Sequence, residues 1–129
     1  MIMATSKFNN KVLYTPEGKF DSRKEYRRWC SLRLLEKAGQ IAGLRRQVRY
    51  EIIPAIWEEV PVQLKTKVRI DRRCVQRASH YTADFVYTDT ATGRTIVEDV
   101  KGRDATKTEA YELRKKLMRF VHGIEIIEK

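Results

Sequence analysis

The stretch YTADFVYTDTATGRTIVEDVKG, residues 81–102, decides the fold of this chain. Residues 81–88 are rich in the aromatic and β-branched side chains that favour strands. Turn residues follow over 89–93, where Gly93 can adopt a left-handed backbone conformation. Residues 95–101 then form a second strand, so this part of the sequence predicts a β-hairpin.

The predicted hairpin carries two acids and a lysine. Asp84 lies in its first strand, and Asp99 and Lys101 lie in its second. Because strand side chains alternate, Asp99 and Lys101 project to one face and Val100 projects to the other. A charge among apolar neighbours is costly unless it is paired or binds a metal. Two interpretations therefore stand side by side: a salt bridge at the rim of the sheet, and a functional cluster.

Two helices are predicted on either side of the hairpin in the sequence. Residues 22–25 read SRKE, which has the spacing of a capping box, and good helix formers follow as far as residue 37. Residues 106–109 read TKTE and predict a second capping box, and Gly123 ends the helix behind it. The apolar stripe of this second helix is expected to be core: Leu113, Leu117 and Phe120.

Two more strands complete the predicted fold, over residues 47–53 and 124–127. The order is then helix, strand, strand, strand, helix, strand, which predicts an α/β fold with a mixed central sheet flanked by helices. The length fits a single domain over residues 1–129. Within it we expect residues 1–20 to form an N-terminal arm and residues 55–78 to form a basic insertion.

The charge of the chain favours a polyanionic partner. Lys and Arg number 27 and Asp and Glu number 17, which gives a formal net charge of +10. Such a surplus repels itself unless it meets a polyanion, and nucleic acid is the commonest one. The alternative is a basic surface kept for solubility, or one that binds acidic lipid or ribosomes. The candidates for nucleic-acid contacts in the insertion are Arg69, Arg72 and Arg73.

Several other classes of protein are excluded by what the sequence lacks. It has neither a P-loop nor a G-x-G-x-x-G motif, and His80 and His122 lack metal-ligand spacing. Cys30 and Cys74 are far apart, which fits a reducing compartment. No apolar run suits a signal peptide or a membrane span. We therefore expect a soluble, cytoplasmic protein without a membrane partner; the family resemblance described next implies a bacterial host or phage-infected cell.

The order of Asp84 and then, fifteen positions later, residues 99–101 (DVK) resembles the PD-(D/E)XK nuclease superfamily. A helix that begins FDSRKE precedes this motif, as in small phage-encoded endonucleases related to Holliday-junction resolvases. The resemblance covers roughly residues 18–128 outside the basic insertion. The chain departs from the pattern at Ala83, where the superfamily's name expects Pro, and at Arg114, where the phage relatives carry Lys.

The resemblance implies a restriction-endonuclease-like core and a metal-dependent DNA endonuclease that hydrolyses phosphodiester bonds, acting on branched or structured DNA in phage replication or recombination. It implies Mg²⁺ or Mn²⁺ bound by Asp84, Asp99 and the Val100 carbonyl, which are hard oxygen ligands. Lys101 would orient the attacking water or stabilise the developing charge. Glu25 would reach the same site from the first helix, although the capping box alone also explains this residue.

The second helix adds candidate contacts to DNA near the cleaved phosphate: Thr106, Lys107, Tyr111 and Arg114. A solvated helix face is the alternative. Symmetric cutting of a junction would need two active sites and hence a homodimer. Two rival functions stay open: a non-catalytic basic DNA-binding module on a nuclease fold, and an RNA-binding or ribosome-associated protein.

Overall fold

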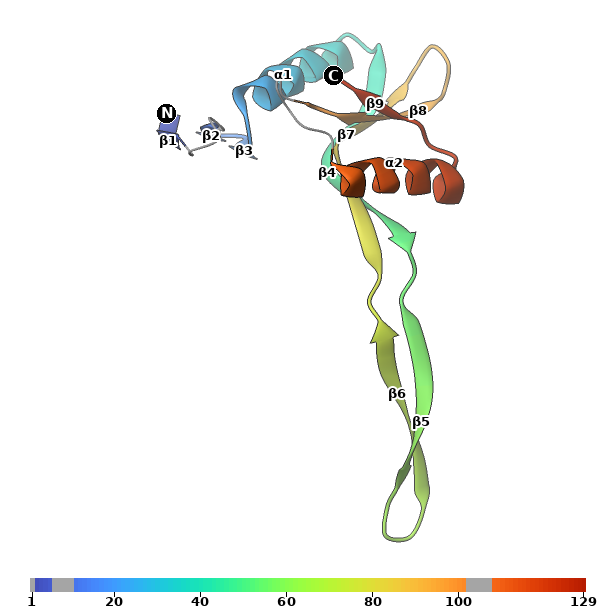
Figure 1. Cartoon of the computed structure of the whole chain (residues 1–129). Helices are drawn as coiled ribbons and strands as arrows, with labels where there is room; N and C mark the ends of the chain where they lie inside the picture. The colour runs from blue at the N-terminus through green and yellow to red at the C-terminus, as the bar shows by residue number, and fades with distance from the viewer. Residues whose placement is uncertain (1, 6–10, 102–107) are drawn as a thin grey trace.

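The computed structural model describes residues 2–5, 11–101 and 108–129. Its elements follow one another in the order β1 (Ile2–Thr5), β2 (Lys11–Thr15), β3 (Gly18–Phe20), α1 (Arg23–Lys37), β4 (Ile41–Ile53), β5 (Ile56–Gln63), β6 (Val68–Gln76), β7 (Ser79–Asp89), β8 (Thr95–Asp99), α2 (Glu109–His122) and β9 (Ile126–Glu128). Strands β4, β7, β8 and β9 form a four-stranded sheet in that spatial order. The pairs β4–β7 and β7–β8 are antiparallel, and the pair β8–β9 is parallel. The predicted α/β fold, a mixed central sheet with two helices, is therefore confirmed (Figure 1).

The two helices cover opposite faces of this sheet. Leu32 of α1 packs with Phe85 on one face, and Met118 of α2 packs with Val97 on the other. Ile96 and Val97 are neighbours in β8 and belong to the two different clusters, as the alternation of a strand requires. Each face of the sheet thus has its own apolar core.

All four predicted strands differ from the observed ones at their ends, and β7 spans residues 79–89 rather than 81–88. Helix α1 runs from Arg23 to Lys37 as predicted, behind the N-cap Ser22. Strand β4 begins at residue 41 rather than 47, because β7 pairs with it along its whole length. Strand β8 ends at residue 99 rather than 101, and β9 begins at residue 126 rather than 124.

The second helix begins later than predicted. Its N-cap is Thr108, whose hydroxyl accepts a hydrogen bond from the backbone N–H of Tyr111 at 3.1 Å. Glu109 is the first helical residue, so the predicted capping box over residues 106–109 is wrong. Thr106 and Lys107, which we expected to contact DNA, lie outside the described residues.

The face that α2 buries also differs from the expected one. Tyr111 and Met118 are 8% and 0% exposed, whereas Leu113 and Phe120 are 56% and 77% exposed. Of the predicted core stripe, Leu117 packs against the buried cluster. The expectation that Leu113 and Phe120 are core is therefore wrong, because the helix presents the neighbouring stripe to the sheet.

A long two-stranded hairpin projects from the sheet (Figure 1). Its strands β5 and β6 continue the direction of β4 and β7, and they pair antiparallel from Ile56↔Gln76 to Gln63↔Val68. This hairpin, residues 56–76, is called the arm below. Most side chains of the arm are exposed. It occupies the stretch that we expected to be a basic insertion.

The N-terminal segment also contains strands. Strands β1, β2 and β3 form a three-stranded antiparallel sheet. Phe20, at the end of β3, is fully buried and contacts Tyr26 and Trp29 of α1, with ring centroids 5.0 and 6.2 Å apart. These contacts fix the chain where it enters α1.

Candidate active site

An irregularity in the side-chain alternation of β7 lies at the centre of the candidate site. Tyr81 and Ala83 of β7 pack on the α2 side of the sheet, but Phe85 and Tyr87 pack on the α1 side. A regular strand would place all four side chains on one face. The alternation therefore changes phase at Asp84, which leaves this half-buried carboxylate between the two cores.

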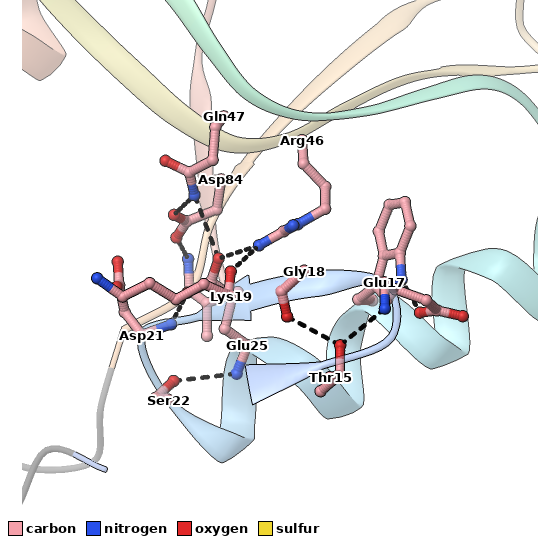
Figure 2. A network of polar contacts seen from close by, with 12 residues as sticks. Thr15, Glu17, Gly18, Lys19, Asp21, Ser22, Glu25, Arg46, Gln47 and Asp84 are labelled. Carbon is pink, nitrogen blue, oxygen red and sulfur yellow. Dashed lines mark hydrogen bonds and ion pairs between the residues drawn. The ribbon is translucent and has the colours of Figure 1, made fainter. Parts of the chain in front are cut away.

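Gln47 faces this irregularity from the neighbouring strand. The register of the β4–β7 pair places it opposite Asp84, and its φ is 51°. A left-handed backbone is uncommon for residues other than Gly. The side-chain Nε2 of Gln47 donates at 3.2 Å to Asp84 Oδ1 and at 3.2 Å to Glu25 Oε1 (Figure 2). One amide group thus joins an acid of β7 to an acid of α1.

Glu25 reaches this cluster from the first turn of α1. Its side chain is buried, and its Oε2 accepts a hydrogen bond from the backbone N–H of Asp21 at 3.3 Å. Its own backbone N–H donates to the Ser22 side chain, so the predicted N-cap is confirmed. The guanidinium of Arg46 lies 3.8 Å from Glu25 Oε1, and burial, followed by the charge of Asp21, raises the pKa of Glu25. Glu25 both supports the start of α1 and faces the site.

Asp84 and Asp99 interact across the β7–β8 pair. The backbone N–H of Val100 donates to Asp84 Oδ2 at 2.8 Å. Burial, followed by hydrogen bonding with Asp99, raises the pKa of Asp84 to about 7. Two acids this close favour a shared proton or a bound cation, because both cannot be ionised at low cost.

Lys101 lies on the same side of the sheet as Asp99, as predicted. Its Nζ is 3.0 Å from Asp99 Oδ2 and 3.6 Å from the centroid of the Tyr111 ring. The Tyr111 hydroxyl donates to Glu128 at 3.1 Å, which fixes the ring against the lysine. Val100 packs instead on the α1 side, so the predicted alternation over residues 99–101 is confirmed.

Glu98, beside Asp99 in the chain, has a structural role. It is fully buried, and Arg28 donates to it through Nε at 2.8 Å and through Nη2 at 2.7 Å. The Tyr87 hydroxyl also donates to it. This two-point ion pair ties β8 to α1 and thereby fixes the end of the strand that carries Asp99.

The cluster offers hard oxygen donors without a closed cage. Within the described part of the chain, no three His, Cys, Asp or Glu side chains converge to form a metal-binding group. Mg²⁺ is usually bound through one or two carboxylates, completed by water and by phosphates of the substrate. The donor chemistry of Asp84 and Asp99 fits such an ion, and Glu25 adds a third carboxylate linked through Gln47.

A polar pocket of about 400 Å³ opens beside Asp99 and Lys101 on the α2 side. Tyr111 and Arg114, both expected to contact DNA, line this pocket. Arg114 is exposed, whereas Tyr111 is buried against Lys101. The remaining lining comes from β7: His80, Tyr81 and Thr82.

The three arginines expected to bind nucleic acid lie along the arm, which extends away from the four-stranded sheet (Figure 1). Arg69 Nε is 2.8 Å from Asp71 Oδ1, and Arg73 forms an ion pair with Glu58. Arg72 instead lies over the ring of a tryptophan, 4.8 Å from its centroid. Two of the three charges are therefore balanced within the arm itself.

Sequence reasoning missed Gln47 and the β7 residues of the pocket. Gln47 stands in a predicted strand and belongs to no motif, and a left-handed position is ordinarily signalled by Gly. His80 lacked a sequence neighbour with which it could form a site. The one available signal was proximity in the sequence, since His80 and Thr82 lie in the same strand as Asp84.

Comparisons with known proteins match the chain to one family. The model of a family described as "Protein of unknown function (DUF1064)" matches residues 5–123. No curated protein and no solved structure matches the chain. In the described parts of the chain, neither helix has the length and apolar character needed to cross a membrane.

Proposed function

The chain belongs to the DUF1064 family, and from the arrangement of its carboxylates we propose that it is a metal-dependent DNA endonuclease. One observation carries the proposal. Asp84 and Asp99 interact across a hairpin, Lys101 Nζ lies 3.0 Å from Asp99, and Glu25 is joined to Asp84 through Gln47. Arg46 pairs with Glu25 and Lys101 pairs with Asp99, so the cluster holds three acids and two cations, and Asp84 is the acid that neither ion pair includes.

Mg²⁺ or Mn²⁺ is the cofactor that this donor set fits. Asp84 and Asp99 would hold the ion, and the Val100 carbonyl and Glu25 are the further ligands of the proposal. When bound, such an ion neutralises phosphate charge and lowers the pKa of a coordinated water. The raised pKa of Asp84 supports a cation here, because a positive charge beside this buried carboxylate would favour its ionised form.

The protein's own groups supply position and charge. Lys101 is held between Asp99 and the Tyr111 ring, so its ammonium is placed beside the acids before substrate arrives. There it orients the attacking water or stabilises the charge that develops on the phosphate oxygens. Gln47 fixes the Asp84 carboxylate through Oδ1 while Val100 N–H fixes it through Oδ2.

The substrate of the proposal is branched or structured DNA in phage replication or recombination. The net charge of +10 supports a polyanionic partner. The order of the core elements, α1, β4, β7, β8, α2 and β9, is the order expected for a restriction-endonuclease-like core. A homodimer would supply the two active sites that symmetric cutting of a junction requires.

A cleavage assay tests the proposal. The purified chain is incubated with four-way junction, flap, duplex and single-stranded DNA, in Mg²⁺, in Mn²⁺ and in EDTA. We expect cleavage in the divalent cations, none in EDTA, and a loss of about two orders of magnitude or more in Asp84→Asn and in Asp99→Asn. Glu125→Gln is the matched control, because Glu125 is an exposed acid paired with Arg119.

Other outcomes favour other functions. Binding of DNA with no cleavage under any of these conditions would favour the non-catalytic DNA-binding module. Preference for A-form RNA without cleavage would favour an RNA-binding protein. Cutting that is undiminished in EDTA would overturn the metal-dependent mechanism.

A further inference from the structure

The two faces of the arm differ in charge and in exposed apolar surface. Side chains alternate along a strand, so the regular register from Trp57↔Cys74 to Gln63↔Val68 assigns the residues of β5 and β6 to one face or the other. One face carries the cross-strand pair Glu58↔Arg73 and is called the ion-paired face below. The other carries Trp57 and is called the open face.

The ion-paired face is closed by its own contacts. Arg73 forms an ion pair with Glu58, and Arg69 Nε lies 2.8 Å from Asp71 Oδ1. The two valines of β5 on this face are half-buried: Val60 and Val62. Between its ion pairs, this face therefore presents balanced charges and little exposed apolar surface.

The open face keeps its apolar side chains in solvent. Trp57, Val68 and Ile70 are 50%, 54% and 57% exposed. Pro61, which pairs with Ile70 in the register, is exposed as well. A two-stranded hairpin is only marginally stable in water, and exposed apolar patches commonly mark binding surfaces. A ligand on this face would cover the surface that the chain itself leaves uncovered.

A cation and an aromatic ring meet on the open face. The guanidinium of Arg72 lies 4.8 Å from the centroid of the Trp57 ring, a diagonal contact between the two strands. Glu59 lies opposite Arg72 in the register, but the two form no ion pair in the described part of the chain. The charge of Arg72 is therefore available to a ligand that also reaches the indole ring.

The free cations favour a nucleic-acid strand as that ligand. Lys65 and Lys67, in the turn at the end of the arm, form no ion pair with any described residue, and neither does Arg72. The ligand must therefore offer negative charge together with a flat apolar surface. A strand with unpaired bases offers both, because its phosphates alternate with bases that can stack on aromatic rings. In a duplex the bases are already stacked on one another.

We propose that the open face binds a DNA strand with unpaired bases, one of which stacks on Trp57 while the free cations hold the flanking phosphates. The inference rests on the proposed endonuclease function and names the class of its substrate, which is DNA with a flap, a gap or a single-stranded branch. Arg72 supplies the charge beside the stacked base. Because every base has a π face, this contact selects unpaired DNA without reading its sequence.

Fluorine NMR tests this contact without cleavage. The chain contains two tryptophans, so a preparation labelled with fluorotryptophan gives one signal for Trp57 and one for Trp29. Trp29 is the internal control, because its ring is stacked on Phe85 beneath α1. In EDTA, we expect a single-stranded oligothymidylate to shift the Trp57 signal saturably and to leave the Trp29 signal in place. A blunt duplex of the same length should shift Trp57 much less.

Substitutions then measure what the ring contributes. Trp57→Ala should bind the single-stranded oligothymidylate about tenfold or more weakly, because a stacking surface is lost. Trp57→Phe should keep most of the affinity, since it retains an aromatic ring. Tyr14→Ala is the matched control: Tyr14 is an aromatic residue of similar exposure, 53%, outside the arm, and its variant should bind like the wild type. The fluorine shift is measured on the unsubstituted chain, so a misfolded variant cannot mimic it.

Cleavage kinetics distinguish the two proposals. If the open face selects unpaired strands, Trp57→Ala raises KM for flap DNA and leaves kcat close to that of the wild type. A Trp57 shift on addition of the single strand, in a protein that cleaves no DNA, would keep the open face as a binding site and remove the endonuclease. Cleavage of flap DNA with wild-type KM in Trp57→Ala, and no Trp57 shift, would overturn the stacking site and leave the endonuclease intact. A Trp57 shift that follows protein concentration rather than DNA would assign the open face to a second copy of the chain and would also overturn the proposal.

Discussion

Gln47 Nε2 lies 3.2 Å from Asp84 Oδ1, across the pair of strands that forms the centre of the sheet. The backbone of Gln47 has a φ of 51°, which turns its side chain out of the regular alternation of β4. The same amide nitrogen reaches Glu25. A neutral side chain is thus the link that holds two carboxylates of the candidate site at fixed positions.

Replacing Gln47 tests this link. Gln47→Ala removes the donor to two carboxylates, so we expect a loss of about 1–3 kcal/mol in the free energy of unfolding and about a tenfold fall in cleavage rate. Urea unfolding and single-turnover cleavage measure the two effects. DNA affinity should stay close to that of the wild type.

A glycine at the same position separates the side chain from the backbone. Gln47→Gly adopts a φ of 51° without strain, so it should be at least as stable as Gln47→Ala and equally slow in cleavage. If the glycine variant cleaved at the wild-type rate, the amide would have no part in the site.

The pKa of Asp84 predicts how stability varies with pH. In the folded protein burial raises this pKa from 3.8 to about 7. The folded state therefore holds the proton more tightly than the unfolded chain, and the stability that this provides is complete below pH 3.8 and is lost as the pH rises through about 7. In EDTA, the free energy of unfolding of Asp84→Asn should exceed that of the wild type by on the order of 2 kcal/mol at pH 8, and the two should differ little at pH 4.

Addition of Mg²⁺ at pH 8 should make the wild type more stable than Asp84→Asn. A cation bound to the folded state raises the melting temperature of the wild type, and Asp84→Asn should gain much less. Melting curves with and without Mg²⁺ give both numbers without any assay of activity. Equal gains in the two proteins would show that Asp84 does not bind the ion.

Lys101→Met tests whether the lysine has a catalytic role or only pairs with Asp99. The substitution keeps the aliphatic stem and removes the charge, so turnover should fall by about two to four orders of magnitude under the catalytic interpretation. Folding and DNA affinity should survive, since a partly exposed ion pair contributes about 0–1 kcal/mol. Single-turnover cleavage, a binding titration and a melting curve are measured on one preparation.

The matched control for this variant is Lys115→Met. Lys115 has the same side-chain exposure as Lys101, 28%, and pairs with an acid at 3.1 Å, but it lies outside the cluster. It should cleave like the wild type. Similar losses in both lysine variants would point to a general effect of charge rather than to a catalytic group.

The cations of the arm are of two kinds, those that form an ion pair and those that do not, and we expect only the second kind to contact DNA. Lys65, Lys67 and Arg72 form no ion pair within the described residues, whereas Arg69 is paired with Asp71. Replacing the first three together by Ala should lower the slope of log affinity against log salt concentration by about 3, or about 1 per lost phosphate contact. Fluorescence anisotropy with a labelled junction, at a series of salt concentrations, measures the slope.

A variant of equal net charge provides the comparison. Arg69→Ala with Asp71→Ala removes an ion pair of the arm and leaves the net charge unchanged. Its salt slope should match that of the wild type. An unchanged slope in the triple variant as well would mean that the arm does not contact DNA.

Local signals in the sequence predicted most of the central fold. The capping residues before Arg23 located α1, and the strands around the turn at Gly93 located β7 and β8. Alternation also placed Asp99 and Lys101 on one face, because β8 is regular up to its last residue. These features depend on neighbours in the chain, and the sequence shows them directly.

Features that depend on contacts between distant elements were out of reach. Helix α2 offers two adjacent stripes, and packing against the sheet selected Tyr111 and Met118 over Leu113 and Phe120. A tyrosine fits either environment, since its ring is apolar and its hydroxyl is polar. The change of phase at Asp84 requires an unusual backbone at a glutamine on another strand, which no local pattern reports.

The arm has a consequence for how this protein can vary. Strands β4 and β7 already pair with each other up to Ile53 and Ser79, where the arm begins. Removing the arm would therefore leave an ordinary hairpin between them, and lengthening it would add paired residues far from the sheet. The length of the arm can therefore change independently of the candidate site. Insertions and deletions of paired residues can change how far the molecule extends, while Asp84, Asp99 and Glu25 stay in place.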